Sequence, residues 1–157
     1  MVRIINAELA DGMGNLVNRC CGKSLNPLKI RPAITLASFH ACGALGVELL
    51  EMLERTPDTV HDYYQVMEFY KYAKVTYNYK RILNTNSLNL CNRGIEQLMS
   101  LIRATNNLFQ TLEPWKLKKE GQVEKFTATM AVSLETVRIV GILLQPIIPS
   151  FSQRLLG

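Results

Sequence analysis

The stretch NAELADGMGNLVNR, residues 6–19, decides how the rest of the chain is organised. Its apolar residues recur at helical spacings, which predicts one amphipathic helix whose buried stripe is Leu9, Met13, Leu16, Val17 and Cys20. Asn15 and Arg19 fall on another face, one turn apart. A guanidinium beside an amide suits planar hydrogen-bonding groups such as base edges and phosphates. The alternative is a solvated polar face on a core helix.

The composition is that of one globular domain, predicted to span residues 1–157. Apolar residues make up 48% of the chain and charged residues 20%, unlike a disordered protein. The net charge of +5 is compatible with a polyanionic partner but too small to indicate one. No apolar run reaches the length of a membrane span, so we expect no membrane contact.

The four cysteines are Cys20, Cys21, Cys42 and Cys91. They form no C-x-x-C pair, and neither histidine lies at a metal-ligand spacing from them. We therefore expect no metal site and no disulfide framework, but reduced and mostly buried thiols. No P-loop, G-x-S-x-G or G-x-G-x-x-G motif occurs, and the chain offers no catalytic residue.

Helical patterns continue along the chain, with no alternating strand pattern. Residues 22–32 are rich in helix breakers and predict an irregular connection. Patterning from Leu49 stops at Arg55, and Thr56-Pro57 resembles a new helix start, with Thr56 as N-cap. Further helices are expected over residues 57–74, 95–112, 123–144 and 150–156, the last capped by Ser150. The prediction is an all-α bundle of four to five helices.

Residues 75–93 do not fit this pattern. These nineteen residues hold five Asn, three basic residues and no acidic one. If Lys74 is joined directly to Gly94, the apolar stripe continues, which predicts one long helix ending near Leu112. Our hypothesis is that residues 75–93 are a translated short intron, and the alternative is a genuine inserted loop. Sequencing the mature transcript decides between them, and without the segment the net charge is +2.

Trp115 is the only tryptophan, and it lies among Lys116, Lys118 and Lys119 just after a helix-breaking proline. An aromatic ring beside cations is the pairing that single-stranded nucleic acid needs, for base stacking and for backbone charge. The alternative is a tryptophan that closes the end of the bundle, its surface covered by lysine side chains. The three lysines are candidate phosphate contacts, although a surface lysine run is usually only solvated.

Three stretches resemble one known domain in the same order along the chain. They are NAELADGMGNLVNR, IRATNNLFQTLEPWKL (residues 102–117) and ILLQPIIPSFSQRLL (residues 142–156). Together they resemble the helical anticodon-binding domain that follows the catalytic domain in methionyl-tRNA synthetases. The pieces LNP at 25–27 and PA at 32–33 are most similar to the mitochondrial branch.

The resemblance implies a function and a site. In the family, the positions matching Asn15, Arg19 and Trp115 recognise the anticodon: the tryptophan stacks on a base, and the other two contact bases or backbone. The implied partner is the CAU anticodon loop of methionine tRNA, and the implied compartment is the mitochondrial matrix. Unpaired loop bases can be splayed out and recognised at their edges, which suits such a site.

The resemblance also implies what this chain lacks. The family's His-x-Gly-His and Lys-Met-Ser-Lys-Ser motifs are absent, so we expect no catalysis and no cofactor here. ATP and Mg²⁺ would be bound by a catalytic domain in cis, which in the full-length enzyme would attach methionine to tRNA. The alternative function is a helical protein-interaction module whose apolar groove takes a partner helix.

Overall fold

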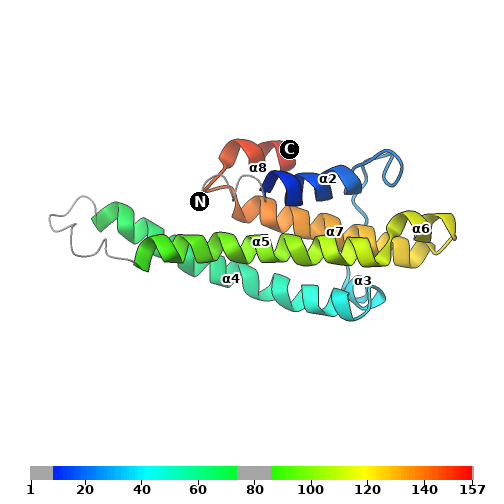
Figure 1. The fold of residues 1–157 in the computed structure, drawn as a ribbon, viewed down its shortest axis with the longest axis horizontal. Helices are drawn as coiled ribbons and strands as arrows, with labels where there is room; N and C mark the ends of the chain where they lie inside the picture. The colour runs from blue at the N-terminus through cyan, green and yellow to red at the C-terminus, as the bar shows by residue number, and fades with distance from the viewer. Residues whose placement is uncertain (1–8, 74–85, 157) are drawn as a thin grey trace.

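The structure, a computed structural model, describes residues 9–73 and 86–156, with side chains described for residues 11–65 and 93–156. Every regular element in these ranges is a helix, which confirms the all-α prediction. In chain order the elements are the short π-helix η1 (Leu9–Met13), α2 (Gly14–Cys20), α3 (Leu36–Ala41), α4 (Ala44–Ala73), α5 (Asn86–Leu112), α6 (Pro114–Lys119), α7 (Val123–Leu143) and α8 (Pro149–Leu156). They form an elongated bundle (Figure 1).

Helix α7 is the centre of the bundle and contacts every α-helix from α2 to α8. The sequence predicts one buried stripe on it, but residues 128–133 are all buried. By length and composition α7 could cross a membrane, contrary to our expectation, yet 56% of its most apolar window is buried inside the bundle. Burial on several sides accounts for its apolar composition, because a helix enclosed by others is hydrophobic all round.

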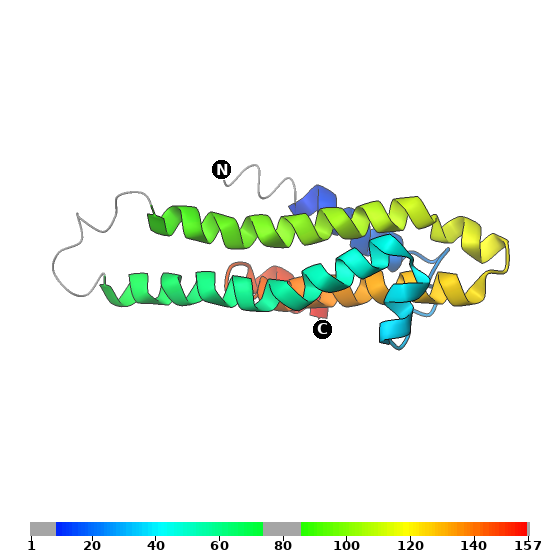
Figure 2. The same cartoon turned by 90° about the horizontal axis from the view of Figure 1, so that it is seen from below.

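Helices α4 and α5 lie side by side and run antiparallel (Figure 2). The single long helix was predicted for a chain in which Lys74 is joined directly to Gly94, and in the chain as it stands the two halves are separate helices. Gly94 faces α4, where an added Cβ would lie 3.2 Å from Cδ2 of Tyr63. The part of the stripe on α5 is buried at Ile95, Met99 and Ile102, whereas the part on α4, at residues 66–73, lies outside the described side chains. Of the hypothetical insertion, residues 75–85 lie outside the described residues, and residues 86–93 begin α5.

Pro57 lies inside α4, so the predicted helix start at Thr56-Pro57 is also wrong. The hydroxyl of Thr56 does not cap a new helix but donates to the carbonyl of Met52 at 2.6 Å, within α4. Thr56 is fully buried between Leu53 and Val60, which are also buried. The three positions are spaced by three and four residues, so they lie on one face of α4. Burial of this face keeps the helix continuous across Pro57, which lacks an N–H.

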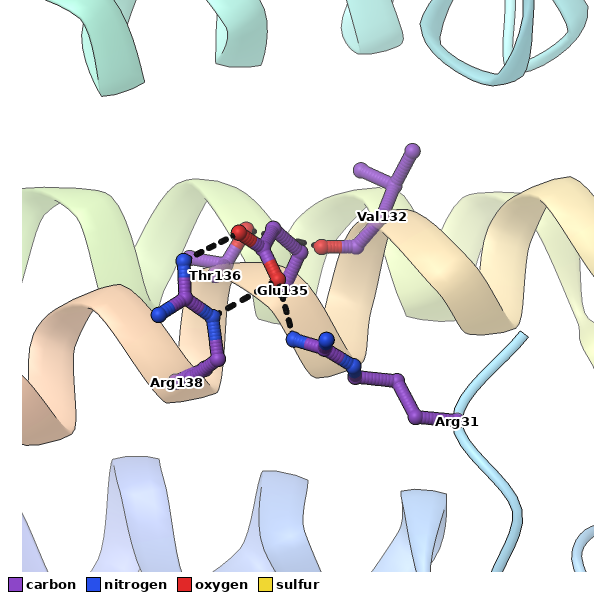
Figure 3. Close-up of polar contacts among 5 residues, drawn as sticks. All are labelled: Arg31, Val132, Glu135, Thr136 and Arg138. Carbon is purple, nitrogen blue, oxygen red and sulfur yellow. Dashed lines mark hydrogen bonds and ion pairs between the residues drawn. The ribbon is translucent and has the colours of Figure 1, made fainter. Parts of the chain in front are cut away.

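An ion-pair cluster fixes the connection from α2 to α3 on the surface of α7 (Figure 3). Arg31 Nη1 lies 2.7 Å from Glu135 Oε2, while Arg138 donates to both carboxylate oxygens from Nε and Nη2 at 2.9 and 2.6 Å. The Arg138 hydrogen bonds, and the charges of Arg138 and Arg31, hold the pKa of Glu135 below its usual value although partial burial opposes them. The connection itself has no regular helix, as predicted.

The C-terminal helix begins at Pro149, two residues earlier than an N-cap at Ser150 implies. Pro149 is the first residue of α8, where its missing N–H costs no hydrogen bond. Ser150 therefore lies inside the helix and is not its N-cap; the carbonyl of Ile148 accepts instead from the N–H groups of Phe151 and Ser152. Gly141 of α7 packs closely under α8, 2.8 Å from Leu155 Cδ2 if a Cβ is added.

Candidate nucleic-acid interface

Helix α2 presents three different faces to its surroundings. Its core face carries Leu16 and Cys20 and continues the buried Met13 of η1; each of these residues is at most 1% exposed, as the sequence predicts. A second face lines an open cavity toward α8, of about 330 Å³, that includes Gly14, Val17, Asn18, Phe151, Arg154 and Leu155. The third face carries the predicted pair, with Asn15 exposed and Arg19 partly exposed.

Arg19 reaches from α2 to the C-terminal end of α5. Its Nη1 donates to Oε1 of Gln110 at 3.0 Å. One turn earlier on α5, Nδ2 of Asn106 donates to the carbonyl of Gly12 at 3.0 Å. A Cβ on Gly12 would lie 3.3 Å from Cγ2 of Ile102, so this glycine of η1 permits the close approach.

Trp115 lies just beyond the same end of α5. Helix α5 ends at Leu112, Glu113 adopts a left-handed conformation with φ 45° and ψ 61°, and Pro114 begins α6. This turn sets the indole against Phe109, with ring centroids 6.3 Å apart and planes tilted by 50°. Phe109 is fully buried, whereas Trp115 is half-buried. The ring therefore closes the bundle end and still keeps an exposed part.

The three candidate lysines of α6 differ in their surroundings. Lys116 pairs with Glu113 at 2.6 Å, with both side chains substantially exposed. Lys118 donates through Nζ to the carbonyl of Ser24 at 2.6 Å and to that of Leu25 at 3.4 Å. Lys119 is exposed at the end of the helix. A surface ion pair such as Lys116–Glu113 contributes at most about 1 kcal/mol, so another anion can replace Glu113 as the partner of Lys116 at little cost.

Arg19 and Trp115 thus both contact the C-terminal end of α5. Gln110 holds Arg19, and Phe109 supports Trp115. Asn15 lies one turn before Arg19 on the same face of α2. Gln110 and Asn106 were not predicted as part of the site, although two amides about one turn apart on a predicted helix indicate a shared face.

The chemistry available at this end of the molecule is hydrogen bonding, stacking and positive charge. Within residues 11–65 and 93–156, no three metal-ligating side chains come together. Cys20, Cys21 and Cys42 are free thiols, and Cys91 lies outside the described side chains. The arrangement can bind a planar or anionic group and supplies no nucleophile–base pair.

Comparison with known proteins finds relatives of this chain but no matching family model. No family model matches the chain. The chain is 31% identical over its whole length to the mitochondrial methionine–tRNA ligase of Takifugu rubripes and 30% identical to that of Homo sapiens, covering 24% and 25% of those proteins. It is 28% identical to the methionine–tRNA ligase of Synechocystis sp., over 98% of the chain and 24% of that protein.

A solved structure shares the fold. The crystal structure of Mycobacterium tuberculosis methionyl-tRNA synthetase bound by methionyl-adenylate matches 99% of the chain with a TM-score of 0.68, at 22% identity and over 26% of that protein. The fold and the sequence matches together define the chain as a helical segment of an aminoacyl-tRNA ligase. It is homologous to one segment of the methionine–tRNA ligases and spans about a quarter of the length of the relatives it matches.

Proposed function

We propose that the chain binds the anticodon loop of methionine tRNA, recognising CAU by stacking and hydrogen bonding without a covalent step. The observation that supports this most is that Arg19 and Trp115 contact the same end of α5, at the adjacent residues Gln110 and Phe109. A rigid helix end that holds a guanidinium and a half-exposed ring can test unpaired bases without a large conformational change.

Each proposed contact follows from the chemistry of its side chain. The exposed part of the Trp115 ring stacks on one base, which is worth about 1–3 kcal/mol. Arg19 has five N–H donors, and its bond to Gln110 uses one of them. Asn15 offers an exposed amide one turn away, which both donates and accepts. Lys116 and Lys119 add phosphate contacts, with phosphate competing for Lys116 against Glu113.

In the full-length protein, this binding would hold the tRNA while the remaining three quarters of the polypeptide attach methionine with ATP and Mg²⁺. Mitochondrial ligases stand among the relatives beside bacterial ones, and they support a mitochondrial site of action. The isolated chain is expected to bind weakly, because a second grip on the same tRNA by the rest of the protein raises the effective concentration.

A test of the proposal is substitution of Arg19 with a matched control. Arg19→Lys keeps the charge but loses the planar fork, so affinity for an RNA hairpin with a CAU loop should fall about tenfold or more. Arg55→Lys makes the same change at an exposed arginine on α4 and should leave affinity unchanged. Equal affinities for the two variants and the original chain, all folded, would rule out recognition through Arg19.

A second candidate function is docking of a partner helix, favoured by an apolar surface at the α3–α4 side. Leu28, Ile30 and Leu36 are 76%, 59% and 60% exposed. Near Leu36 is an open cavity of about 360 Å³ lined by Ile34, Thr35, Leu36, Phe39, Leu50, Leu53, Glu54, Glu135 and Ile139. Salt separates the two candidates, since RNA affinity falls as salt rises and apolar docking changes little.

A further inference from the structure

Lys118 stands apart from its lysine neighbours because it contacts main chain far away in the sequence. Its Nζ donates to the carbonyls of Ser24 and Leu25, at 2.6 and 3.4 Å, and lies 5.8 Å from the ring centroid of Phe126. Two carbonyl oxygens and an aromatic face all offer negative potential to the ammonium group. The charge is thus already partly satisfied within the protein.

The loop that Lys118 contacts is an ordered unit that directly follows α2. The N–H groups of Leu25 and Asn26 both donate to the carbonyl of Gly22, at 3.1 and 2.8 Å. The Asn26 side chain accepts from the N–H of Ile30 and donates to its carbonyl, at 3.0 and 2.9 Å. Residues 22–30 are therefore held together by local hydrogen bonds, and they begin three residues beyond Arg19.

Two links now join the end of α2 to the helices around Trp115. One is the bond from Arg19 to Gln110 on α5, and the other is the bond from Lys118 on α6 to the loop at residues 22–26. The second link starts from α6, the helix that carries Trp115. Apart from this bond, α6 and α2 are connected through α7, which contacts both, and through α5, which contacts α6 and holds Arg19.

We propose that Lys118 is a positioning residue, which clamps the loop at residues 22–26 to α6 and thereby fixes Arg19 relative to Trp115. Its effect on RNA binding rests on the function proposed above, whereas the clamp itself does not. A phosphate-binding lysine releases a counterion when RNA binds, but a lysine held by carbonyls releases none. The two roles therefore differ in the salt dependence of binding.

The experiment compares Lys118→Met, Lys118→Arg and Lys119→Met in the full chain. Met retains an apolar stem over Phe126 but cannot donate, and Arg restores donors to the carbonyls. For each variant, binding to an RNA hairpin with a CAU loop is measured across a salt series, and amide hydrogen exchange is measured over residues 22–30. Lys119→Met is the matched control, since it removes an exposed charge one residue away.

For Lys118→Met, we expect faster amide hydrogen exchange in the loop and about three- to tenfold weaker RNA binding. The slope of log affinity against log salt concentration should stay unchanged. Lys118→Arg should recover both the exchange rate and the affinity, and Lys119→Met should lower the slope by about one without altering exchange. A slope lowered by one in Lys118→Met, with loop exchange unchanged, would show a phosphate contact and overturn the proposal. Unchanged binding and exchange would also overturn it. If the original chain does not distinguish RNA loops, the anticodon function fails, while loop exchange still decides the clamp.

Discussion

Cys20 is fully buried on the core face of α2, and burial, aided by the neighbouring Cys21, raises the pKa of its thiol to about 12. In the unfolded chain the same thiol titrates near 9. Between these values the unfolded state releases a proton that the folded state keeps, so the free energy of unfolding falls as pH rises. This group contributes a slope of up to about 1.4 kcal/mol per pH unit.

The measurement is urea unfolding of the original chain and Cys20→Ala between pH 8 and pH 11. Cys20→Ala should be less stable at pH 8 because it leaves a small cavity, and its stability should fall less steeply above pH 9. Parallel curves for the two proteins would mean that the Cys20 thiol ionises equally in both states.

Glu113 is the one residue between α5 and α6, and its left-handed backbone turns the chain so that Trp115 meets Phe109. A side chain in this conformation costs about 1–2 kcal/mol. Glu113→Gly and Glu113→Ala both lose the pair with Lys116, so their comparison isolates the backbone effect. The Gly variant should be more stable than the Ala variant by about 1 kcal/mol in thermal or urea unfolding.

At the scale of single residues, sequence patterns predict burial better than partners. The helical spacing correctly places Met13, Leu16 and Cys20 in the core. Spacing cannot predict that Arg19 meets Gln110 or that Lys118 meets Ser24, because these contacts join positions more than ninety residues apart. They depend on how α2 is placed against α5 and α6, which is a tertiary property.

At the scale of elements, Gly46 sets the tight packing of α3 against the first turn of α4. A Cβ there would collide with the carbonyl oxygen of Phe39 and lie 2.6 Å from Cβ of Cys42. Since the carbonyl belongs to the backbone, relief requires α3 to move. Gly46→Ala should therefore lower the free energy of unfolding by at least about 1–3 kcal/mol.

Gly14 supplies the matched control for this prediction. It begins α2, and no neighbour lies within 4 Å of an added Cβ. Gly14→Ala should be neutral or stabilising by up to about 1 kcal/mol, because alanine favours helix. A Gly46→Ala variant as stable as Gly14→Ala would contradict the close packing of α3 on α4.

Element boundaries were predicted well where local chemistry decides them and badly where burial does. Pro114 ends α5 and Gly121 precedes α7, as their backbone preferences predict. Pro57 carries an equally strong local signal, yet α4 continues through it because Leu53, Thr56 and Val60 are all buried on one stripe. At this position the burial of the stripe outweighs the local preference of proline for the start of a helix.

The reversal between α4 and α5 was missed for a related reason. A stripe that continues across a gap is compatible both with one straight helix and with two helices that pack on each other. Only the second arrangement buries Leu98, Met99 and Ile102 of α5 together with Leu49 and Leu53 of α4. Periodicity measures which face is apolar and carries no information about chain direction.

At the scale of the whole molecule, the elongated bundle gathers the proposed recognition groups at one end. Helix α6 lies beside the loop that follows α2, at the opposite end of the bundle from the C-terminal end of α4 and the N-terminal end of α5 (Figure 1). Recognition at this end leaves the rest of the bundle as a rigid support, with α7 in its centre. The fold class followed from the sequence, whereas the arrangement of this end required the structure.

The anticodon function is tested most directly by following the fluorescence of Trp115, the single tryptophan, at low salt. The chain is titrated with an RNA hairpin carrying CAU and with one whose first anticodon base is changed. We predict that the CAU hairpin quenches the fluorescence at lower concentration, because a base stacks on the exposed part of the indole. Equal curves for both hairpins, or no change with a folded chain, would contradict recognition by Asn15, Arg19 and Trp115.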